Sequence, residues 1–256
     1  MMKNSDLNAF PQKDSDDPIE LSVLIPAHNE EKVIEKTIRN FARILTTQQI
    51  NHEVLIVNDN STDNTKNLLI QLSHELLSVR YIDNLTSRGF GQAVKYGLNE
   101  YHGRCVAIVM ADGSDDPKDL ISFYRKWCEG YDCVFGDRFA ENSIVVEYPW
   151  PKLFINRLGN NLIRALFLIR YKDVSNAFKL YSRHVIDDLH PLESSGFNLT
   201  VELPLKAIVK NYTYTVTPNS WYNRNLGKSK WKINETLSEY LLIVWKCWKM
   251  KVTRKQ

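Results

Sequence analysis

The sequence predicts an α/β fold of the Rossmann-like kind, with a mainly parallel sheet covered by helices on both faces. Short runs rich in Val, Ile and Leu alternate with helix-length segments through the first half of the chain. The apolar runs are continuous, which is typical of strands buried on both faces of a parallel sheet. The predicted strands span residues 21–26, 52–57, 79–83, 105–110 and 132–136.

The segments between these strands carry helix signals. Asn29 precedes residues 30–45, whose apolar side chains fall on one helical face. Ser61 or Thr62 can cap the next helical segment, because short polar side chains accept hydrogen bonds from the first free N–H groups of a helix. Helices in these positions are the connections that parallel strands require.

Composition and charge exclude several classes of protein. At 256 residues and 43% hydrophobic, the chain can bury one substantial core. A formal net charge of +3, without a dense basic stripe in the first half, argues against a nucleic-acid partner. No apolar run approaches the ~18 residues that span a bilayer. Four cysteines without CxxC pairs favour reduced thiols and a cytosolic location.

Polar side chains follow three of the predicted strands. They form the segments PAHNE at 26–30, NDNSTD at 58–63 and ADGSDD at 111–116. In open α/β sheets the ligand lies beyond the carboxyl ends of the strands, so these segments are expected to face one crevice. Taken singly, each is better explained as a turn or a helix cap, since Asn and Asp favour both, but three in succession on adjacent strands favour a site.

Seven segments, in order from about residue 20 to 232, resemble the inverting nucleotide-sugar glycosyltransferases of the GT-A fold known as family 2. Within that family the resemblance is to polyprenyl-phosphate sugar synthases of the dolichol-phosphate mannose synthase type. The segments are VLIPAHNEE, VLIVNDNSTDNT, SRGFGQAVKYGL, VMADGSDDP, GDRF, DVSNAFKLYSR and NRNLGKSKW. The resemblance implies a single GT-A catalytic domain over 19–232, after a flexible polar leader at 1–18 and before a helical tail at 233–256.

The resemblance implies which residues bind the donor. Carboxylates suit ribose hydroxyls and base N–H groups, which are donors, and glycines let the backbone approach a nucleotide. Asn58 stands where the family often has Asp. An ordinary loop before an amphipathic helix is the alternative for the glycines, because GxG alone is a weak signal. The implied nucleotide-sugar residues are Pro26, Asn29, Glu30, Asn58, Asp59, Gly89, Gly91, Ala111 and Asp112.

The segment VMADGSDDP is similar to the family's Asp-X-Asp motif, with Met110 in place of the first Asp. The resemblance implies that Asp112 binds Mg²⁺ or Mn²⁺, aided by Ser114 or Asp115, and that the cation offsets charge on the leaving diphosphate. A thioether is a poor ligand for such a cation. For Asp116 a helix cap before Pro117 is the preferred interpretation.

Basic residues of the second half are expected to bind phosphate. The resemblance places Arg224, Lys228 and Lys230 around Gly227 in a cationic loop, where a solvated charge run is the alternative. On the acceptor side it implies Asn176, Lys179 and Arg138, whereas Phe178 and Leu180 are expected in the core.

Two segments suit contact with a membrane. Between 139 and 169, a core helix accounts for Leu158, Leu162, Ile163 and Leu166, whereas Trp150, Phe154, Arg157 and Arg164 suit a bilayer interface. The basic tail, with two tryptophans, suits an interfacial helix on an anionic membrane. Packing against the sheet or a partner membrane subunit is the alternative for the tail.

The expected function is therefore inverting, metal-assisted transfer of a sugar from a UDP- or GDP-sugar to a polyprenyl phosphate such as dolichyl or undecaprenyl phosphate, by a protein peripheral on the cytosolic membrane face. Asp112, Arg224 and Lys228 are the expected catalytic residues. A glycan or other hydroxyl acceptor, in surface polysaccharide assembly, would need a base, for which Asp115 is the nearest candidate and Glu202 a weaker one. A non-catalytic nucleotide-sugar-binding subunit is the third interpretation.

Overall fold

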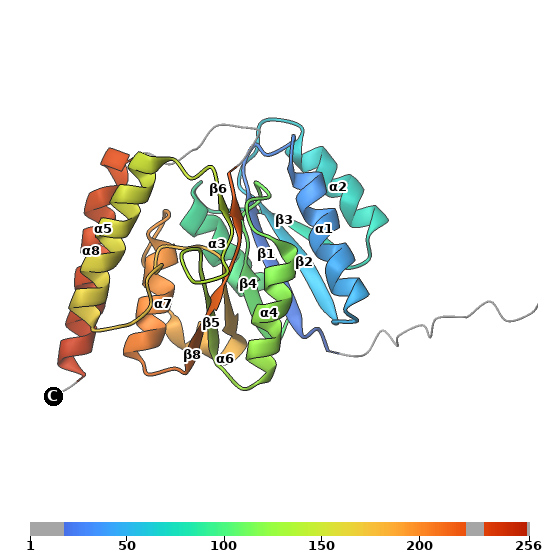
Figure 1. The fold of residues 1–256 in the computed structure, drawn as a ribbon. Coiled ribbons are helices and arrows are strands. Elements are labelled where there is room, and N and C mark those ends of the chain that lie inside the picture. Colours follow the sequence, from blue (N-terminus) through green and yellow to red (C-terminus); the bar gives the residue numbers. More distant parts are fainter. Residues whose placement is uncertain (1–17, 224–232, 255–256) are drawn as a thin grey trace, which may run out of the picture.

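A seven-stranded sheet runs through the centre of the molecule (Figure 1). The computed structural model describes residues 18–223 and 233–254. The strand order is β3-β2-β1-β4-β7-β5-β8. The strands are β1 (Leu21–Ala27), β2 (His52–Asn58), β3 (Val79–Asp83), β4 (Cys105–Ile108), β5 (Cys133–Asp137), β7 (Lys179–Ser182) and β8 (Tyr214–Pro218).

The sheet is mainly parallel, as predicted. β1 pairs in parallel with β2 and β4, β3 with β2, and β5 with β8. β7 is antiparallel to both of its neighbours, β4 and β5, and was not predicted. A second, two-stranded sheet joins β6 (Val145–Val146) to β9 (Trp221–Tyr222). The α/β fold class is confirmed, with one reversed strand between the two parallel groups.

Helices cover both faces of the sheet (Figure 1). One face packs against α1, α2 and α4, and the other against α3, α6 and α7, with α8 and α5 outside them. The helices are α1 (Ile34–Thr47), α2 (Thr65–Glu75), α3 (Phe90–Glu100), α4 (Pro117–Cys128), α5 (Trp150–Phe167), α6 (Arg183–Leu189), α7 (Leu199–Val209) and α8 (Ile233–Thr253).

The strands are continuously apolar because each contributes to two cores. In β1, Leu24 packs into the core on the α3 side, whereas Val23 and Ile25 pack into the core on the α1 side. Leu55 and Ile56 divide in the same way in β2. Successive side chains of a strand point to opposite faces, so a sheet covered twice needs an apolar residue at every position.

Two helices begin later in the chain than predicted. α1 begins at Ile34 after a turn, and the Asn29 side chain accepts instead from the Thr62 N–H at 2.7 Å. α2 begins only at Thr65, so Ser61 and Thr62 precede it by a further turn. The side chains of Asn29 and Ser61 instead join the turn after β1 to the turn after β2. The Asp116 cap is confirmed by its bond from the Lys118 N–H at 2.9 Å.

The predicted core side of α5 is confirmed for Ile163 and wrong for the three leucines. Leu158 and Leu162 are 63% and 56% exposed, and Leu166 is exposed as well. α5 is buried through Asn160, Ile163 and Phe167, which form a different stripe of the helix. Phe178 and Leu180 are fully buried, as expected.

α3 depends on a glycine for its distance from the sheet. A β-carbon at Gly97 would lie 2.3 Å from Leu24 Cδ1 and 2.8 Å from Val57 Cγ2. We therefore expect Gly97→Ala to lower the free energy of unfolding by about 1–3 kcal/mol through overpacking. Urea unfolding followed by circular dichroism measures it.

Gly159→Ala is the matched control, because no atom lies within 4 Å of its added β-carbon. There the better helix propensity of Ala is expected to raise stability by about 0.5–1 kcal/mol. Equal destabilisation of both variants would contradict the close contact of α3 with β1 and β2.

Candidate active site

The carboxyl ends of β1 and β2 are joined at one edge of the sheet. The Asp59 N–H donates to the carbonyl of Ala27 at 2.7 Å, and His28 Nδ1 lies 2.7 Å from the carbonyl of Asp59. Pro26, the last but one residue of β1, is buried. The first two predicted strand ends therefore do lie together, as the parallel order requires.

Asn29 and Glu30 follow β1 and are held by the turn after β2. Asn29 adopts a positive φ of 51°, and its N–H donates to Ser61 Oγ at 3.1 Å. The Glu30 N–H donates to Thr65 Oγ1 at 2.9 Å. Both predicted nucleotide-binding residues thus lie on a platform whose two turns are bonded to each other.

Asp59 is a buried carboxylate that positions the following loop. Its Oδ1 accepts from Asn84 Nδ2 at 2.8 Å and its Oδ2 accepts from the Gly89 N–H at 3.0 Å. Asn84 is also buried. Asn84 was missed by the sequence reasoning, although it directly follows the third apolar run.

Asn58 has a structural reason to be an amide. Its Nδ2 donates to Asp83 Oδ1 at 2.7 Å, and Lys66 Nζ lies 2.7 Å from Asp83 Oδ2. An aspartate at position 58 would place a second carboxylate against Asp83 and lose this donor. Asn58, where the family often has Asp, therefore fits the carboxylate of Asp83 at the end of β3.

The glycines of the loop before α3 lie against protein backbone. Gly89 has a φ of 149°, and a β-carbon at Gly91 would lie 2.6 Å from the carbonyl carbon of Ser195 and 2.7 Å from the carbonyl oxygen of Gly196. The rings of Phe90 and Phe197 stack beside them at 4.5 Å. The structure therefore accounts for both glycines by the segment at 192–198, whereas the expected nucleotide contact stays a prediction.

Glu202 holds that segment in place. Its carboxylate accepts from the N–H groups of Glu193 at 2.8 Å and Ser194 at 2.7 Å, and pairs with Lys206 at 2.6 Å. Burial by itself would raise the pKa of Glu202, but these bonds outweigh it and lower the pKa below its usual range. A carboxylate so engaged is unsuited to the role of a general base.

Asp115 organises the loop after β4. Its Oδ2 accepts from the Met110 N–H at 2.9 Å, and its backbone bridges to Trp221 in β9. Burial raises the pKa of Asp115 to about 7; the Met110 bond opposes this shift and the charge of Asp112 adds to it. Met110 therefore contributes a backbone donor to the loop.

Asp112 and Ser114 present oxygen atoms at the end of this loop. The Ser114 N–H donates to Asp112 Oδ1 at 3.1 Å. Ser114 Oγ is buried and has no hydrogen-bond partner among the described residues, which leaves an oxygen ligand available. Carboxylate and hydroxyl oxygens fit Mg²⁺ or Mn²⁺.

The protein offers few ligands to such a cation. Across residues 18–223 and 233–254, no group of three or more His, Cys, Asp and Glu side chains is placed to hold a metal. The donor set of Asp112 and Ser114 therefore fits a hard cation that also takes oxygen ligands from a diphosphate and water.

The three predicted acceptor residues have protein partners. Arg138 forms a buried bidentate pair with Asp173, with both N–O distances 2.8 Å. Lys179 Nζ donates to the carbonyls of Val174, Asn176 and Thr200, although burial lowers its pKa to about 7. Asn176 Nδ2 donates to the carbonyl of Gly136 at 2.9 Å. These bonds hold β5 and β7 together, and contact with acceptor phosphate stays a prediction.

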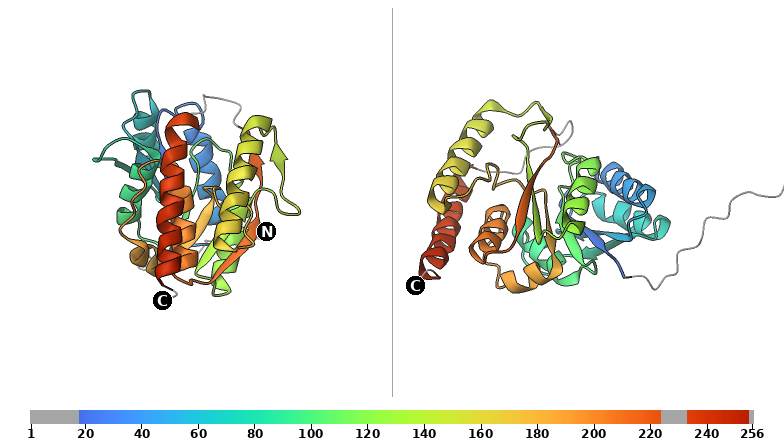
Figure 2. Two further views of the ribbon diagram at one scale, coloured as in Figure 1. Left: turned by 90° about the vertical axis from the view of Figure 1, so that its left-hand side faces the viewer. Right: turned by 60° about the horizontal axis from the view of Figure 1, so that its bottom comes forward.

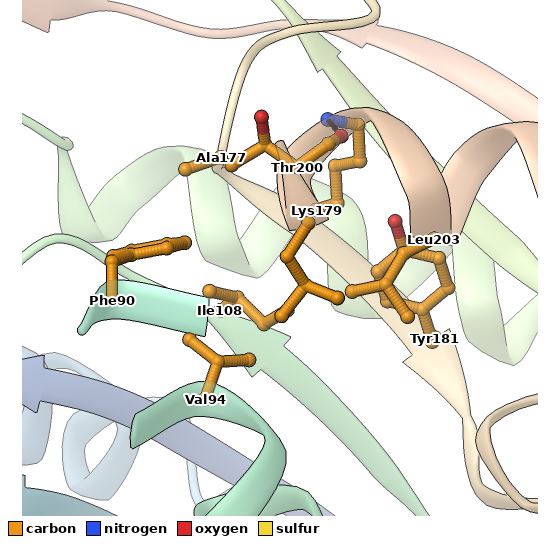
Figure 3. A pocket seen from close by; sticks show the side chains of 9 residues that line it. Phe90, Val94, Ile108, Ala177, Lys179, Tyr181, Thr200 and Leu203 are labelled. Carbon is orange, nitrogen blue, oxygen red and sulfur yellow. Dashed lines mark hydrogen bonds between the residues drawn. The ribbon is translucent and has the colours of Figure 1, made fainter. Parts of the chain in front are cut away.

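A small cavity between α3, β4, β7 and α7 does not resemble a nucleotide site (Figure 3). Its walls are mainly apolar, and the ammonium end of Lys179 lies beside Thr200. The lining residues are Phe90, Val94, Ile108, Ala177, Lys179, Tyr181, Leu199, Thr200 and Leu203.

Arg224, Lys228 and Lys230 lie outside the described residues, so their phosphate-binding roles stay predictions. The last described residues before Arg224 lie beside the Asp112 loop. The Tyr222 N–H donates to the carbonyl of Ser114 at 3.0 Å, and Asn223 follows directly. The leader at 1–18 lies outside the description except for its last residue, Pro18.

Comparison with known proteins identifies the family. The model of glycosyl transferase family 2 matches residues 22–189. An uncharacterised glycosyltransferase of Synechocystis is 30% identical over 68% of this chain and 54% of its own length. Polyprenol monophosphomannose synthase of Mycolicibacterium smegmatis is 26% identical over 81% of this chain and 79% of its own length. The chain belongs to glycosyl transferase family 2.

A solved structure shares the fold. Glucosyl-3-phosphoglycerate synthase of Mycobacterium tuberculosis, in complex with Mn²⁺, UDP-glucose and phosphoglyceric acid, superposes with a TM-score of 0.67 at 14% identity, over 90% of this chain and 80% of that one.

An uncharacterised glycosyltransferase of Bacillus subtilis is 33% identical over 70% of this chain. The chain spans about half, 54%, of the length of the Bacillus and Synechocystis proteins.

The ion pair of Glu202 makes a prediction about stability and pH. We expect Glu202→Gln to lower the free energy of unfolding by about 3 kcal/mol at neutral pH, because the charge of buried Lys206 is left without a carboxylate partner. A carboxyl whose folded pKa is lowered stabilises above its unfolded pKa of 4.5, and this contribution is lost as the pH falls through the folded pKa.

Urea unfolding at several pH values tests this, with Glu129→Gln as the control. Glu129 pairs with Lys126 at the surface, so its loss is expected to cost less than about 1 kcal/mol. A wild-type-to-variant difference that grows as the pH falls would contradict the role of Glu202.

Proposed function

We propose that this protein transfers a sugar from a nucleotide-sugar donor to a polyprenyl phosphate, with inversion at the anomeric carbon. The observation that carries the proposal is the pair of oxygen donors, Asp112 and Ser114, at the end of β4 beside the bonded ends of β1 and β2. A ligand at this edge of the sheet would meet the nucleotide platform and the oxygen donors together.

The donor is a UDP- or GDP-sugar. Asn29, Glu30 and Asp59 lie where base and ribose would bind, with Asn58, Pro26 and Ala111 completing the platform. The Mn²⁺ and UDP-glucose complex of the structural relative supports a nucleotide-sugar donor and a divalent cation. A buried Asp59 that is fixed by Asn84 and Gly89 needs little rearrangement on binding, which favours pre-organised recognition.

Asp112 and Ser114 would hold Mg²⁺ or Mn²⁺ together with the diphosphate. When bound, the cation offsets negative charge on the leaving nucleoside diphosphate. The Ser114 N–H and the Asp115–Met110 bond keep the Asp112 loop in one conformation. Arg224, Lys228 and Lys230 are proposed to bind the phosphates.

A phosphate acceptor suits this site. It is anionic at neutral pH, so it can attack the anomeric carbon without a strong general base. The protein's task is then to hold nucleophile and leaving group in line. The similarity to polyprenol monophosphomannose synthase over 81% of this chain supports a polyprenyl phosphate, met on the cytosolic membrane face.

A hydroxyl acceptor is the second candidate, favoured by one observation. Burial brings the pKa of Asp115 to about 7, which is suitable for a general base. Against it, the carboxylate is 4% exposed and accepts from the Met110 N–H, so it would have to leave that bond to reach a substrate.

Asp112 makes the first prediction about activity. We expect Asp112→Ala to abolish transfer to below about one hundredth of the wild-type rate, because an interaction worth several kcal/mol in the transition state is lost. Met110→Ala is the matched control: it keeps the backbone N–H that Asp115 accepts and should change mainly packing.

The assay supplies polyprenyl phosphate and pooled UDP- and GDP-sugars with Mg²⁺ or Mn²⁺, and it identifies the sugar lipid by mass spectrometry. Chelation with EDTA should stop transfer, and added Mn²⁺ should restore it. Full metal-dependent activity in Asp112→Ala would show that the metal site is elsewhere. Absence of both turnover and binding for every donor would count against the proposed transfer, whereas binding of a donor without turnover would favour the non-catalytic nucleotide-sugar-binding subunit.

A further inference from the structure

Two helices lie side by side on one flank of the molecule, outside the helices that cover the sheet (Figure 2). α5 and α8 run in the same direction, since Lys251 Nζ donates to the carbonyl of Phe167 near the carboxyl ends of both. α8 is anchored to the core by Ile243, Val244 and Cys247. The pair therefore presents one continuous outer surface, called the two-helix face below.

The two-helix face is apolar over much of its length. Exposed apolar side chains recur every three or four residues on each helix, which aligns them in two ridges. Trp150 is 78% exposed and Phe154 66%. The ridges consist of Trp150, Phe154, Leu158, Leu162 and Leu166 on α5, and of Leu237, Leu241, Trp245, Trp248 and Val252 on α8. A water-exposed patch of this kind marks an interaction surface.

The charges along the two-helix face are mainly positive, and the acidic residues of the two helices are Glu235 and Glu239 in the first turns of α8. No Asp or Glu occurs from Tyr148 to Lys172 or from Tyr240 to Gln256. The basic residues of these segments within the described chain are Lys152, Arg157, Arg164, Arg170, Lys172, Lys246, Lys249, Lys251 and Arg254. The partner of such a face must accept apolar side chains and offer negative charge.

We propose that the two-helix face docks on an anionic lipid surface, with α5 and α8 lying in the plane of the interface. Apolar ridges, tryptophans and flanking cations are the composition of interfacial helices. A second copy of the chain would bring two predominantly cationic faces together, which like-charge repulsion opposes. Each helix contributes one of the two ridges, and the contact between α5 and α8 brings the ridges together on one face.

Docking through the two-helix face would bring the edge of the sheet that carries the candidate active site close to the lipid surface. Both helices begin at the edge of the sheet where the strands have their carboxyl ends (Figure 1). Lys246 of α8 also pairs with Glu193, in the segment whose Ser195 lies against Gly89 and Gly91. The docked helix is thus connected directly to the segment that covers the loop before α3. This inference extends the proposed use of a lipid acceptor, but the docking itself requires no turnover.

Vesicle co-sedimentation of the full chain tests the docking. We expect binding to phosphatidylcholine vesicles that contain phosphatidylglycerol, and at least about tenfold weaker partition for Leu158→Glu/Leu162→Glu and for Leu241→Glu/Trp245→Glu. Leu77→Glu and Leu85→Glu are matched controls, because both leucines are highly exposed at the opposite end of the sheet, beside β3. Arg170→Gln/Lys249→Gln should weaken binding only to the anionic vesicles.

Circular dichroism confirms that each variant is folded, and sedimentation velocity reports the oligomeric state. Vesicle binding that is equal in wild type and both two-helix variants overturns the proposal. So does a wild-type dimer that these variants dissociate, without vesicle binding. Transfer to a short water-soluble prenyl phosphate is expected to be the same in the two-helix variants and wild type, so loss of docking and failure of the proposed transfer are separate results.

Discussion

The buried carboxylate of Asp59 is the interaction on which the candidate site depends. It accepts from Asn84 and from the Gly89 N–H, while its own N–H donates to Ala27. One residue therefore connects the ends of β1, β2 and β3 to the start of α3. Removing a buried acceptor that satisfies two donors would leave both unpaired, which makes such a junction costly to disturb. The position of the loop at Gly89 follows from it.

Charges inside the molecule divide into those with protein partners and those at the edge of the sheet. The Arg138–Asp173 and Glu202–Lys206 pairs are buried, and Lys179 is surrounded by carbonyls. Such groups hold strands and loops in position, because a buried charge is tolerated only when it is paired or fully hydrogen-bonded. Ser114 Oγ is one of several buried polar atoms without a hydrogen-bond partner among the described residues, and it lies two residues from Asp112 in the same loop. The paired charges therefore support the structure of the site, whereas Asp112 and Ser114 are its candidate ligands for a cation.

Apolar residues serve two different partners in this fold. Strand residues such as Leu24 and Ile25 pack against helices on the two faces of the sheet. Leu158 and Leu241, in contrast, are not buried by any of the described residues. Helical periodicity alone is the same in both situations, since an amphipathic stripe suits a core and an interface equally. The sign of the surrounding charge is what distinguishes the two-helix face from an ordinary helix surface.

The sequence by itself determined the features that depend on local or repetitive patterns. Continuous apolar runs predicted the parallel strands because burial on both faces acts at every residue, and the Asp116–Pro117 helix start needs only a bond two residues along the chain. Tertiary structure alone decided the partners of Asn29, whose side chain bonds Thr62 33 positions away, and of Glu202. It also decided the reversal of β7 and which stripe of α5 is buried. These depend on which surfaces meet after folding, and no local pattern encodes that.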